Sequence, residues 1–321
     1  MINPAQTMNR FKGISAALTS AFFLGMAPVF GVRAMMLGMP PLAVVAIRTL
    51  LAAILLLVII VIFKRQYLFI YPAGLLGCLL AGWINGLGSL FYYSALGRIG
   101  AGVGQLLYSI YPLFLVLWLF LDHQPPSRLT LFRITLAIPA VILLIRTNGD
   151  HVDLIGVIQM LIGAALYALH LPINQRVLYD MPAPTVTLYT LFAMSAITVP
   201  VLFFGDTSGV FTQTQGWWPV LGLTLVTFLS RLTLFMGVKN IGGMQTAVLG
   251  LGELLVTMVM AQIWLGERLS THQWVGAVLL VFSLVLVGME KQRPARRATG
   301  GWLSWLSHPS LPSDLPWQPR E

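Results

Sequence analysis

A carboxylate and a guanidinium lie inside long apolar stretches of this chain, where ionisable side chains are costly. Glu253 lies near the middle of the apolar run 243–264, and Arg231 lies toward the end of the preceding run 217–238. A charged side chain at the centre of a membrane helix costs about 2.5–3.5 kcal/mol on insertion scales. Two interpretations stay open: an ion pair between the two residues that fixes packing, or a Glu253 that faces a cavity as an amine ligand or proton carrier.

Two further ionisable residues lie inside apolar runs. Arg48 lies in the run 41–63, where its long side chain could snorkel outward or bind an anionic substrate. His170 precedes Pro172 by two positions and could hydrogen-bond within the bundle or relay protons.

Polar residues also recur at helical spacing on five of the runs, and such stripes are expected to face the bundle or a wet cavity instead of lipid. The stripes are Asn85, Ser89 and Tyr92; Gln105, Tyr108, Ser109 and Pro112; Tyr167, His170 and Asn174; Thr224, Thr227 and Arg231; and Thr246, Gly250, Glu253 and Thr257. Hydrogen bonding between helices is the alternative explanation. The candidate substrate-binding or coupling residues are Glu253, Arg231, Gln105, Tyr108, Asn85, Tyr92, His170, Thr257 and Arg48.

The composition indicates that a bilayer surrounds these runs. Of the 321 residues, 57% are hydrophobic and only 9% are charged, against about 25% charged residues in soluble domains. The mean hydropathy is +0.84. The net charge of +9 does not indicate a nucleic-acid partner, because the basic residues lie between the runs and in the tails.

The apolar runs predict an all-α integral membrane protein with ten transmembrane helices, since about 20 residues span the hydrocarbon core. We place the helices at 13–32, 41–63, 69–93, 101–121, 129–146, 155–175, 183–204, 217–238, 243–264 and 272–289. Lysine and arginine concentrate on the side that holds the N-terminus. Both termini are therefore expected to be cytoplasmic, in a multi-pass protein of the plasma or inner membrane.

The two halves of the chain resemble each other. Pro28 and Pro40 align with Pro172 and Pro184 at one offset, and a second offset aligns Arg98 with Lys239 and Pro112 with Glu253. The repeats are placed at 13–146 and 155–290, followed by a cytoplasmic tail at 291–321 that contains prolines and tryptophans. Five helices per repeat would insert the copies upside down relative to each other, as in many secondary transporters with a midplane site. Within the tail, "GWLSWLSH" either lies in the membrane interface or lacks fixed structure.

The stretches "FYYSALGRIGAGVGQLLYSIYPLFLVLWLFL" and "LGERLS…WVGAVLL" resemble the EamA type of the drug/metabolite transporter superfamily, and the resemblance extends over about residues 14–290. It implies ten helices in two inverted EamA repeats, no cofactor, and movement of small molecules, often export of amino acids or related metabolites. The family usually has proline where Glu253 stands, and Pro112 keeps that pattern in the first repeat.

We therefore expect a secondary transporter, most simply an exporter, that moves small polar metabolites such as amino acids by alternating access. Alternatives are a transporter of organic anions or nucleotide-linked sugars that uses Arg48 and Arg231, or a membrane scaffold without transport. The sequence has no metal-type pairing and no nucleophile constellation, so an enzyme is not expected. Expected partners are the small-molecule substrate, protons as a coupling ion and the lipid bilayer, and a homodimer stays open.

Overall fold

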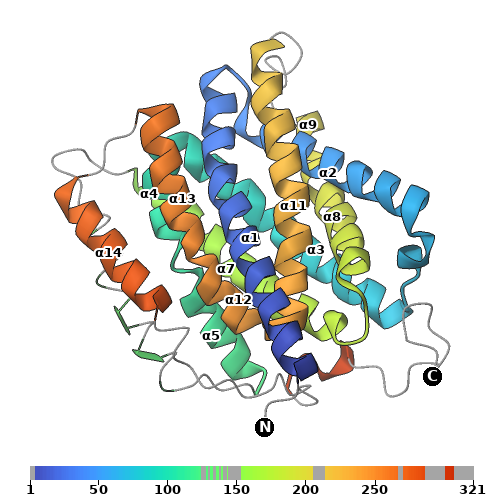
Figure 1. Cartoon of the computed structure of the whole chain (residues 1–321). Coiled ribbons are helices and arrows are strands. Elements are labelled where there is room, and N and C mark those ends of the chain that lie inside the picture. Colours follow the sequence, from blue (N-terminus) through green and yellow to red (C-terminus); the bar gives the residue numbers. More distant parts are fainter. Residues whose placement is uncertain are drawn as a thin grey trace.

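The computed structural model describes residues 4–123, 128, 131–132, 135–136, 139, 143, 153–204, 214–266, 270–285 and 301–306. Within these ranges the long helices form one bundle (Figure 1). The α-helices are α1 Pro4–Met36, α2 Pro41–Phe63, α3 Pro72–Ile99, α4 Ala101–Tyr108, α5 Tyr111–Leu121, α7 Leu154–Leu178, α8 Ala183–Thr198, α9 Val201–Phe204, α11 Trp217–Ile241, α12 Gly243–Gly250, α13 Gly252–Met260 and α14 Thr271–Val285. Shorter helical turns are η1 Arg65–Leu68, η2 Thr214–Gly216, η3 Ala261–Leu265 and η5 Ser304–Leu306.

Eight stretches of the described chain are long and apolar enough to cross a membrane. They are Arg10–Met36, Pro41–Phe63, Pro72–Ile99, Ala101–Leu121, Leu154–Leu178, Ala183–Phe203, Thr214–Ile241 and Gly243–Leu265. The prediction of a multi-pass helical membrane protein is thus confirmed. The expected fifth helix, 129–146, falls mostly outside the described residues. Of the expected tenth, 272–289, the structure describes the part within α14, so ten helices stay a prediction.

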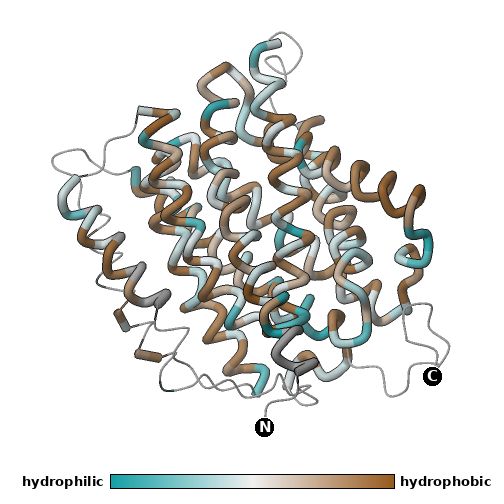
Figure 2. Tube along the Cα trace, viewed as in Figure 1, coloured by the Kyte–Doolittle hydropathy of each residue, from teal (hydrophilic) through white to brown (hydrophobic). Residues whose placement is uncertain are grey.

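The bundle exposes apolar side chains on its outside and buries its membrane-embedded polar side chains among a mainly apolar core, as a lipid solvent requires. Large apolar side chains are exposed along the outer faces, including Phe22, Val58 and Leu225. Hydrophobic residues dominate the helices, while hydrophilic segments gather mainly near helix ends (Figure 2). Inside, Thr49 and Thr187 are fully buried and bond to backbone carbonyls one turn earlier in their own helices.

Proline and glycine set the helix boundaries. Helices α2 and α3 begin with Pro41 and Pro72, where the missing N–H of proline costs nothing because the first turn has no intrahelical acceptor. Helices α3 and α11 end at Gly100 and Gly242, whose φ angles of 75° and 86° favour glycine. Gly100 and Gly242 thus end equivalent helices in the two halves. Aligning these two glycines shifts the predicted pairing of Arg98 with Lys239 by one residue.

Two spans are interrupted in matching places. The first breaks at Ser109 and Ile110, between α4 and α5, and the second breaks at Leu251, between α12 and α13. Pro112 is the second residue of α5, and Glu253 is the second residue of α13. The structure therefore gives the two residues the same place in their repeats, as the sequence alignment predicted.

The helix packing has an internal two-fold pattern. Helix α1 packs along α11, and α3 packs along α7, so exchanging α1 with α7 and α3 with α11 reproduces the same pair of contacts. Helix α7 begins beside the end of α3, through Arg98 and Asp153, and ends beside the end of α5, through Asp122 and Arg176. The start of α1 lies at this same end, because Gly13 contacts Ile241 at the end of α11, and Gln175 of α7 accepts from the Gly243 N–H just beyond it. Helix α7 therefore runs opposite to its counterpart α1, which supports an inverted arrangement of the two halves.

Candidate functional site

Glu253 is buried, with 2% of its surface exposed, on a helix that packs against α1 and α4. It lies in the first turn of α13, where unpaired backbone N–H groups and the helix dipole favour a negative charge. Gly25 of α1 brings the neighbouring backbone close, since a Cβ there would lie 2.4 Å from the Glu253 carbonyl oxygen. The Oε1 atom of Glu253 has no hydrogen-bond partner in the protein.

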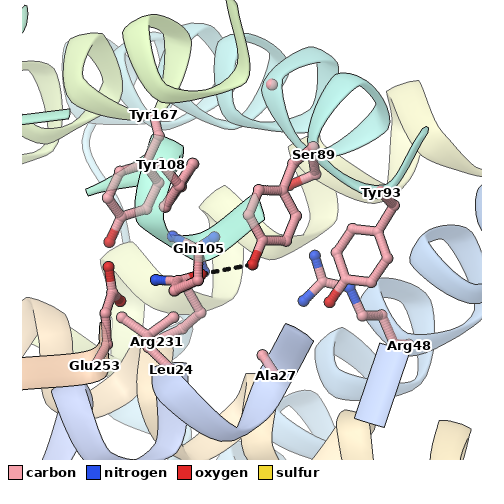
Figure 3. Close-up of a pocket in the computed structure, with 12 residues that line it drawn as sticks. Leu24, Ala27, Arg48, Ser89, Tyr93, Gln105, Tyr108, Tyr167, Arg231 and Glu253 are labelled. Atoms are coloured by element: carbon pink, nitrogen blue, oxygen red, sulfur yellow. Dashed lines mark hydrogen bonds between the residues drawn. The ribbon is translucent and has the colours of Figure 1, made fainter. Parts of the chain in front are cut away.

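A cavity opens beside this carboxylate, between the two halves of the chain (Figure 3). Helices α1, α2, α3 and α4 line it from the first half, and α7, α11 and α13 line it from the second. The volume that the centres of water molecules can occupy in it is ≈ 40 Å³. This volume is enough for a few water molecules. The lining residues are Leu24, Ala27, Arg48, Gly88, Ser89, Tyr92, Tyr93, Gln105, Tyr108, Tyr167, Arg231 and Glu253.

Arg231 lines the cavity and is held from behind by neutral groups. With the Asn85 amide oriented so that its oxygen faces the arginine, that oxygen accepts from Nη1 and Nη2 at 3.1 and 3.2 Å. The Nη1 atom also lies 3.4 Å from His170 Nε2, and the guanidinium lies 5.5 Å from the centre of the Tyr167 ring. These contacts fix the guanidinium without neutralising its charge.

Arg231 and Glu253 face the same cavity without forming an ion pair. Among the described residues, the side chains joined by N–O contacts within 4.0 Å are Arg98 with Asp153 and Arg176 with Asp122. The interpretation of a direct Arg231–Glu253 pair is therefore wrong for this conformation.

Arg48 turns inward toward the cavity. It is 6% exposed, its Nη1 donates to Thr227 Oγ1 at 3.0 Å, and its guanidinium lies 4.5 Å from the centre of the Tyr93 ring. Figure 3 shows the guanidinium beside that ring, across the cavity from Glu253. Its Nε atom is buried without a hydrogen-bond partner. The expectation that Arg48 snorkels away from the bundle is wrong.

Aromatic rings form one wall of the cavity. Tyr108 contacts the rings of Tyr92, Tyr111 and Tyr167, with centroids 4.7, 5.7 and 5.2 Å apart. The Tyr92 hydroxyl donates to Gln105 Oε1 at 2.8 Å, the bond drawn dashed in Figure 3. Such rings offer apolar surface and a negative π-face to a cationic group.

The nine sequence-predicted residues fall into three groups. Six line the cavity: Glu253, Arg231, Gln105, Tyr108, Tyr92 and Arg48. Asn85 and His170 support Arg231 from behind, and His170 Nδ1 is bonded to the carbonyl oxygen of Tyr167. Thr257 does not line the cavity, because its hydroxyl donates to the carbonyl oxygens of Gly25 and Glu253, at 2.7 and 3.0 Å.

Several cavity residues were not on our candidate list. Ser89 and Tyr167 belong to polar stripes that the sequence analysis identified, so the helical spacing already contained that signal. Tyr93 follows Tyr92 directly and falls on another face of the helix, where spacing alone does not select it. Leu24 and Ala27 are apolar, and only the packing of α1 against α11 and α13 brings them to the cavity.

Two ion pairs lie away from the cavity, at opposite ends of α7. Arg176 donates to Asp122 Oδ2 from Nη2 at 2.7 Å and from Nε at 3.2 Å, and both side chains are buried. Arg98 and Asp153 pair at 2.9 Å on the surface. The hydrogen bond from Arg98 and those from the Gly156 and Ile155 N–H groups hold the pKa of Asp153 below its usual range.

No cluster of three or more His, Cys, Asp or Glu side chains in the described ranges could hold a metal ion. The cavity is equipped to bind a ligand. Its walls present one carboxylate, two guanidinium groups, amide and hydroxyl groups, and aromatic faces. A small molecule with both charged and apolar parts could find partners for each of them there.

Comparison with known proteins agrees with the duplicated fold. The model of the EamA-like transporter family matches residues 11–146 and again residues 154–289. The uncharacterized transporter YwfM of Bacillus subtilis is 24% identical over 185 residues, 56% of this chain and 62% of that protein. The chain thus matches less than two thirds of YwfM. The uncharacterized transporter sll1319 of Synechocystis is 25% identical over 234 residues, 68% of each chain.

A solved crystal structure also has this fold, with a TM-score of 0.68 at 16% identity, over 87% of this chain and 97% of that one. At this identity the likeness concerns the fold alone. The two family matches together cover most of the sequence, each over one half of the duplicated bundle. The chain belongs to the EamA-like transporter family.

Proposed function

We propose that this chain is a secondary transporter of small zwitterionic metabolites such as amino acids, exported by alternating access. One observation carries the proposal. The cavity between the halves is lined by a carboxylate and a guanidinium that each have a buried atom without a partner, Glu253 Oε1 and Arg48 Nε. Buried polar atoms left without partners are costly in a protein interior. A ligand with an ammonium and a carboxylate would satisfy both.

In this proposal the substrate ammonium binds Glu253 and the neighbouring tyrosine rings, and the substrate carboxylate binds Arg48. Arg231, already held by Asn85 and His170, supplies positive potential without having to move. When no substrate is bound, a proton on Glu253 would replace the ammonium, which makes proton exchange the simplest coupling reaction. Both termini would be cytoplasmic in a ten-helix protein, as the lysine and arginine distribution predicts.

The test is exchange of a labelled amino acid into proteoliposomes that contain the same amino acid unlabelled, with a panel of unlabelled competitors added outside. The panel contains zwitterionic amino acids, their decarboxylated amines, and their deaminated acids. We expect exchange of a labelled amino acid to be inhibited by the zwitterions, while each singly charged analogue inhibits at least about tenfold less, since it lacks one charge-assisted contact. Equal inhibition by amines and zwitterions would contradict the role of Arg48.

A second candidate function follows from the charge count of the cavity, which has two arginines and one glutamate. This excess of positive charge favours an organic anion as substrate, bound by Arg48 and Arg231. The same panel separates the two functions, because an anion transporter would be inhibited by the deaminated acids and not by zwitterions. Replacing Glu253 by glutamine would then preserve or improve binding.

A further inference from the structure

The segment Gly301–Leu306, beyond the last membrane helix, is seated in the bundle. Leu303 and Leu306 are both 0% exposed, whereas Trp302 and Trp305 are 41% and 46% exposed. The two leucines belong to a buried cluster with Ala81 of α3 and Ile173 of α7. The red segment in Figure 1 lies at the same end of the bundle as the first turn of α1. The described part of "GWLSWLSH" therefore has fixed structure, and a position of its exposed tryptophans in the membrane interface stays a prediction.

The segment contacts both halves of the transporter. From the first half it meets α3, where Gly77 lies against the Leu306 side chain, and the end of α5, where Asp122 Oδ1 accepts from the Leu303 backbone N–H at 3.2 Å. From the second half it meets Ile173 of α7. The other carboxylate oxygen of Asp122 binds Arg176 of α7. One carboxylate therefore joins the segment, α5 and α7.

The fit depends on a glycine. Gly301 has a φ of +87°, and a Cβ built on it would lie 2.4 Å from Asp122 Oδ1 and 2.7 Å from the Asp122 backbone. Any other residue would have to adopt an unfavourable conformation and would also collide with Asp122. Two features therefore suit the segment to this site: the close fit of Gly301 and Leu303 to Asp122, and the buried leucines beside exposed tryptophans.

We propose that Gly301–Leu306 is a latch that holds this end of the transporter closed. The inference rests on the alternating access of the proposed function, in which opening at this end must separate α7 from α3 and α5. A segment bound to all three helices opposes that separation and must lift before the cavity can open to this side. Removing either leucine from its buried site is expected to shift the balance toward opening by about tenfold or more.

The test measures the reactivity of single cysteines with a membrane-impermeant, charged methanethiosulfonate, in a Cys78→Ala background. Ser89→Cys reports whether the cavity is open, and Ala81→Cys reports whether the segment has lifted. The reagent reaches only the end of the bundle that faces the outside of the vesicle. Vesicles with the protein inserted in one orientation or the other therefore test the two ends separately. The measurement requires no substrate, so failure of the zwitterion proposal would leave it unaffected.

Two variants release the latch by different means. Leu303→Asn with Leu306→Asn removes the apolar anchor, and Gly301→Val removes the fit to Asp122. Trp302→Asn with Trp305→Asn is the matched control in the same segment. We expect both release variants to speed labelling of both cysteines about tenfold or more from the end at which the segment lies. The control should stay within about twofold of the unaltered segment, below the smallest change that a buried leucine predicts.

Three outcomes would overturn the latch. If Ala81→Cys becomes reactive while Ser89→Cys stays slow, the segment is a cover and does not restrain the helices. If neither cysteine becomes more reactive in either release variant, the leucines and the glycine do not hold the segment. If the tryptophan control accelerates labelling as much as the release variants, the exposed face of the segment is responsible instead.

Discussion

Replacing Glu253 by glutamine removes the negative charge of the cavity while keeping nearly the same side-chain shape. A hydrogen bond from a substrate ammonium to a carboxylate is worth about 1.5–3 kcal/mol, and one to a neutral amide oxygen about 0.5–1.5 kcal/mol. The difference, about 1–2 kcal/mol, corresponds to about 5–30-fold weaker binding. We therefore expect Glu253→Gln to weaken zwitterion binding by that factor and to slow exchange.

The same substitution should not destabilise the empty protein. The Oε1 atom has no partner to lose, and Arg231 is bound to Asn85 and His170 instead of Glu253. Thr257→Val, one turn further along α13, gives the opposite result. It removes the 2.7 Å hydrogen bond to the buried Gly25 carbonyl oxygen, which lowers the free energy of unfolding by about 0.5–1.5 kcal/mol. It does not change a cavity side chain.

The assay pairs two measurements on the purified protein in lipid nanodiscs: calorimetric binding of the best amino acid of the panel, and the thermal unfolding midpoint. Glu253→Gln should bind the amino acid more weakly at an unchanged unfolding temperature. Thr257→Val should bind it with unchanged affinity and unfold at a lower temperature. Wild-type affinity in Glu253→Gln would show that the carboxylate does not contact the substrate. A collapsed midpoint would show that it is a structural charge.

Three further predictions concern the surroundings of the cavity. Asp122→Asn should destabilise the protein by about 3–5 kcal/mol in denaturant titrations, because it leaves the buried Arg176 charge uncompensated; adding Arg176→Met should recover most of that loss. Asn85→Ala should weaken zwitterion binding about tenfold in calorimetry, since the α11 guanidinium loses its fixed acceptor. The pKa of Asp153 is lowered in the folded state, so its ionised form stabilises the fold fully above about pH 4, and this stabilisation is lost as the pH falls further. In Asp153→Asn, the thermal unfolding midpoint should therefore depend less on pH over that acidic range.

The features best predicted from the sequence were those that a bilayer enforces. A membrane helix needs a long apolar run, and a polar residue inside it must avoid lipid, so helices and inward-facing stripes follow from spacing alone. That rule placed Glu253, Gln105 and Tyr92 at the cavity. It also selected Thr257, because a stripe includes residues that bond to a neighbouring backbone as well as residues that face open space.

The features that were missed depend on which helices meet. The Asp122–Arg176 pair joins residues far apart in the chain, and nothing in either local pattern marks the other as its partner. The orientation of Arg48 depends on Thr227 and Tyr93, which only the packing of α2 beside α3 and α11 brings within reach. Likewise, the burial of Leu303 and Leu306 depends on Ala81 of α3 and Ile173 of α7 lying together, which local composition does not reveal.

The matching helix breaks explain how a carboxylate came to occupy a place where proline is tolerated. The second position of a helix has an N–H without an intrahelical acceptor, so Pro112 loses nothing there in the first half. The same position tolerates a negative charge, because the helix dipole and free N–H groups favour it. Glu253 in the second half is therefore compatible with the backbone that the duplication supplied. Only one of the two equivalent positions carries a carboxylate. In the proposed alternating access, the helix break that moves in the first half would be neutral, and the one that moves in the second half would carry Glu253. A substrate ammonium that follows Glu253 would then be carried by one half alone.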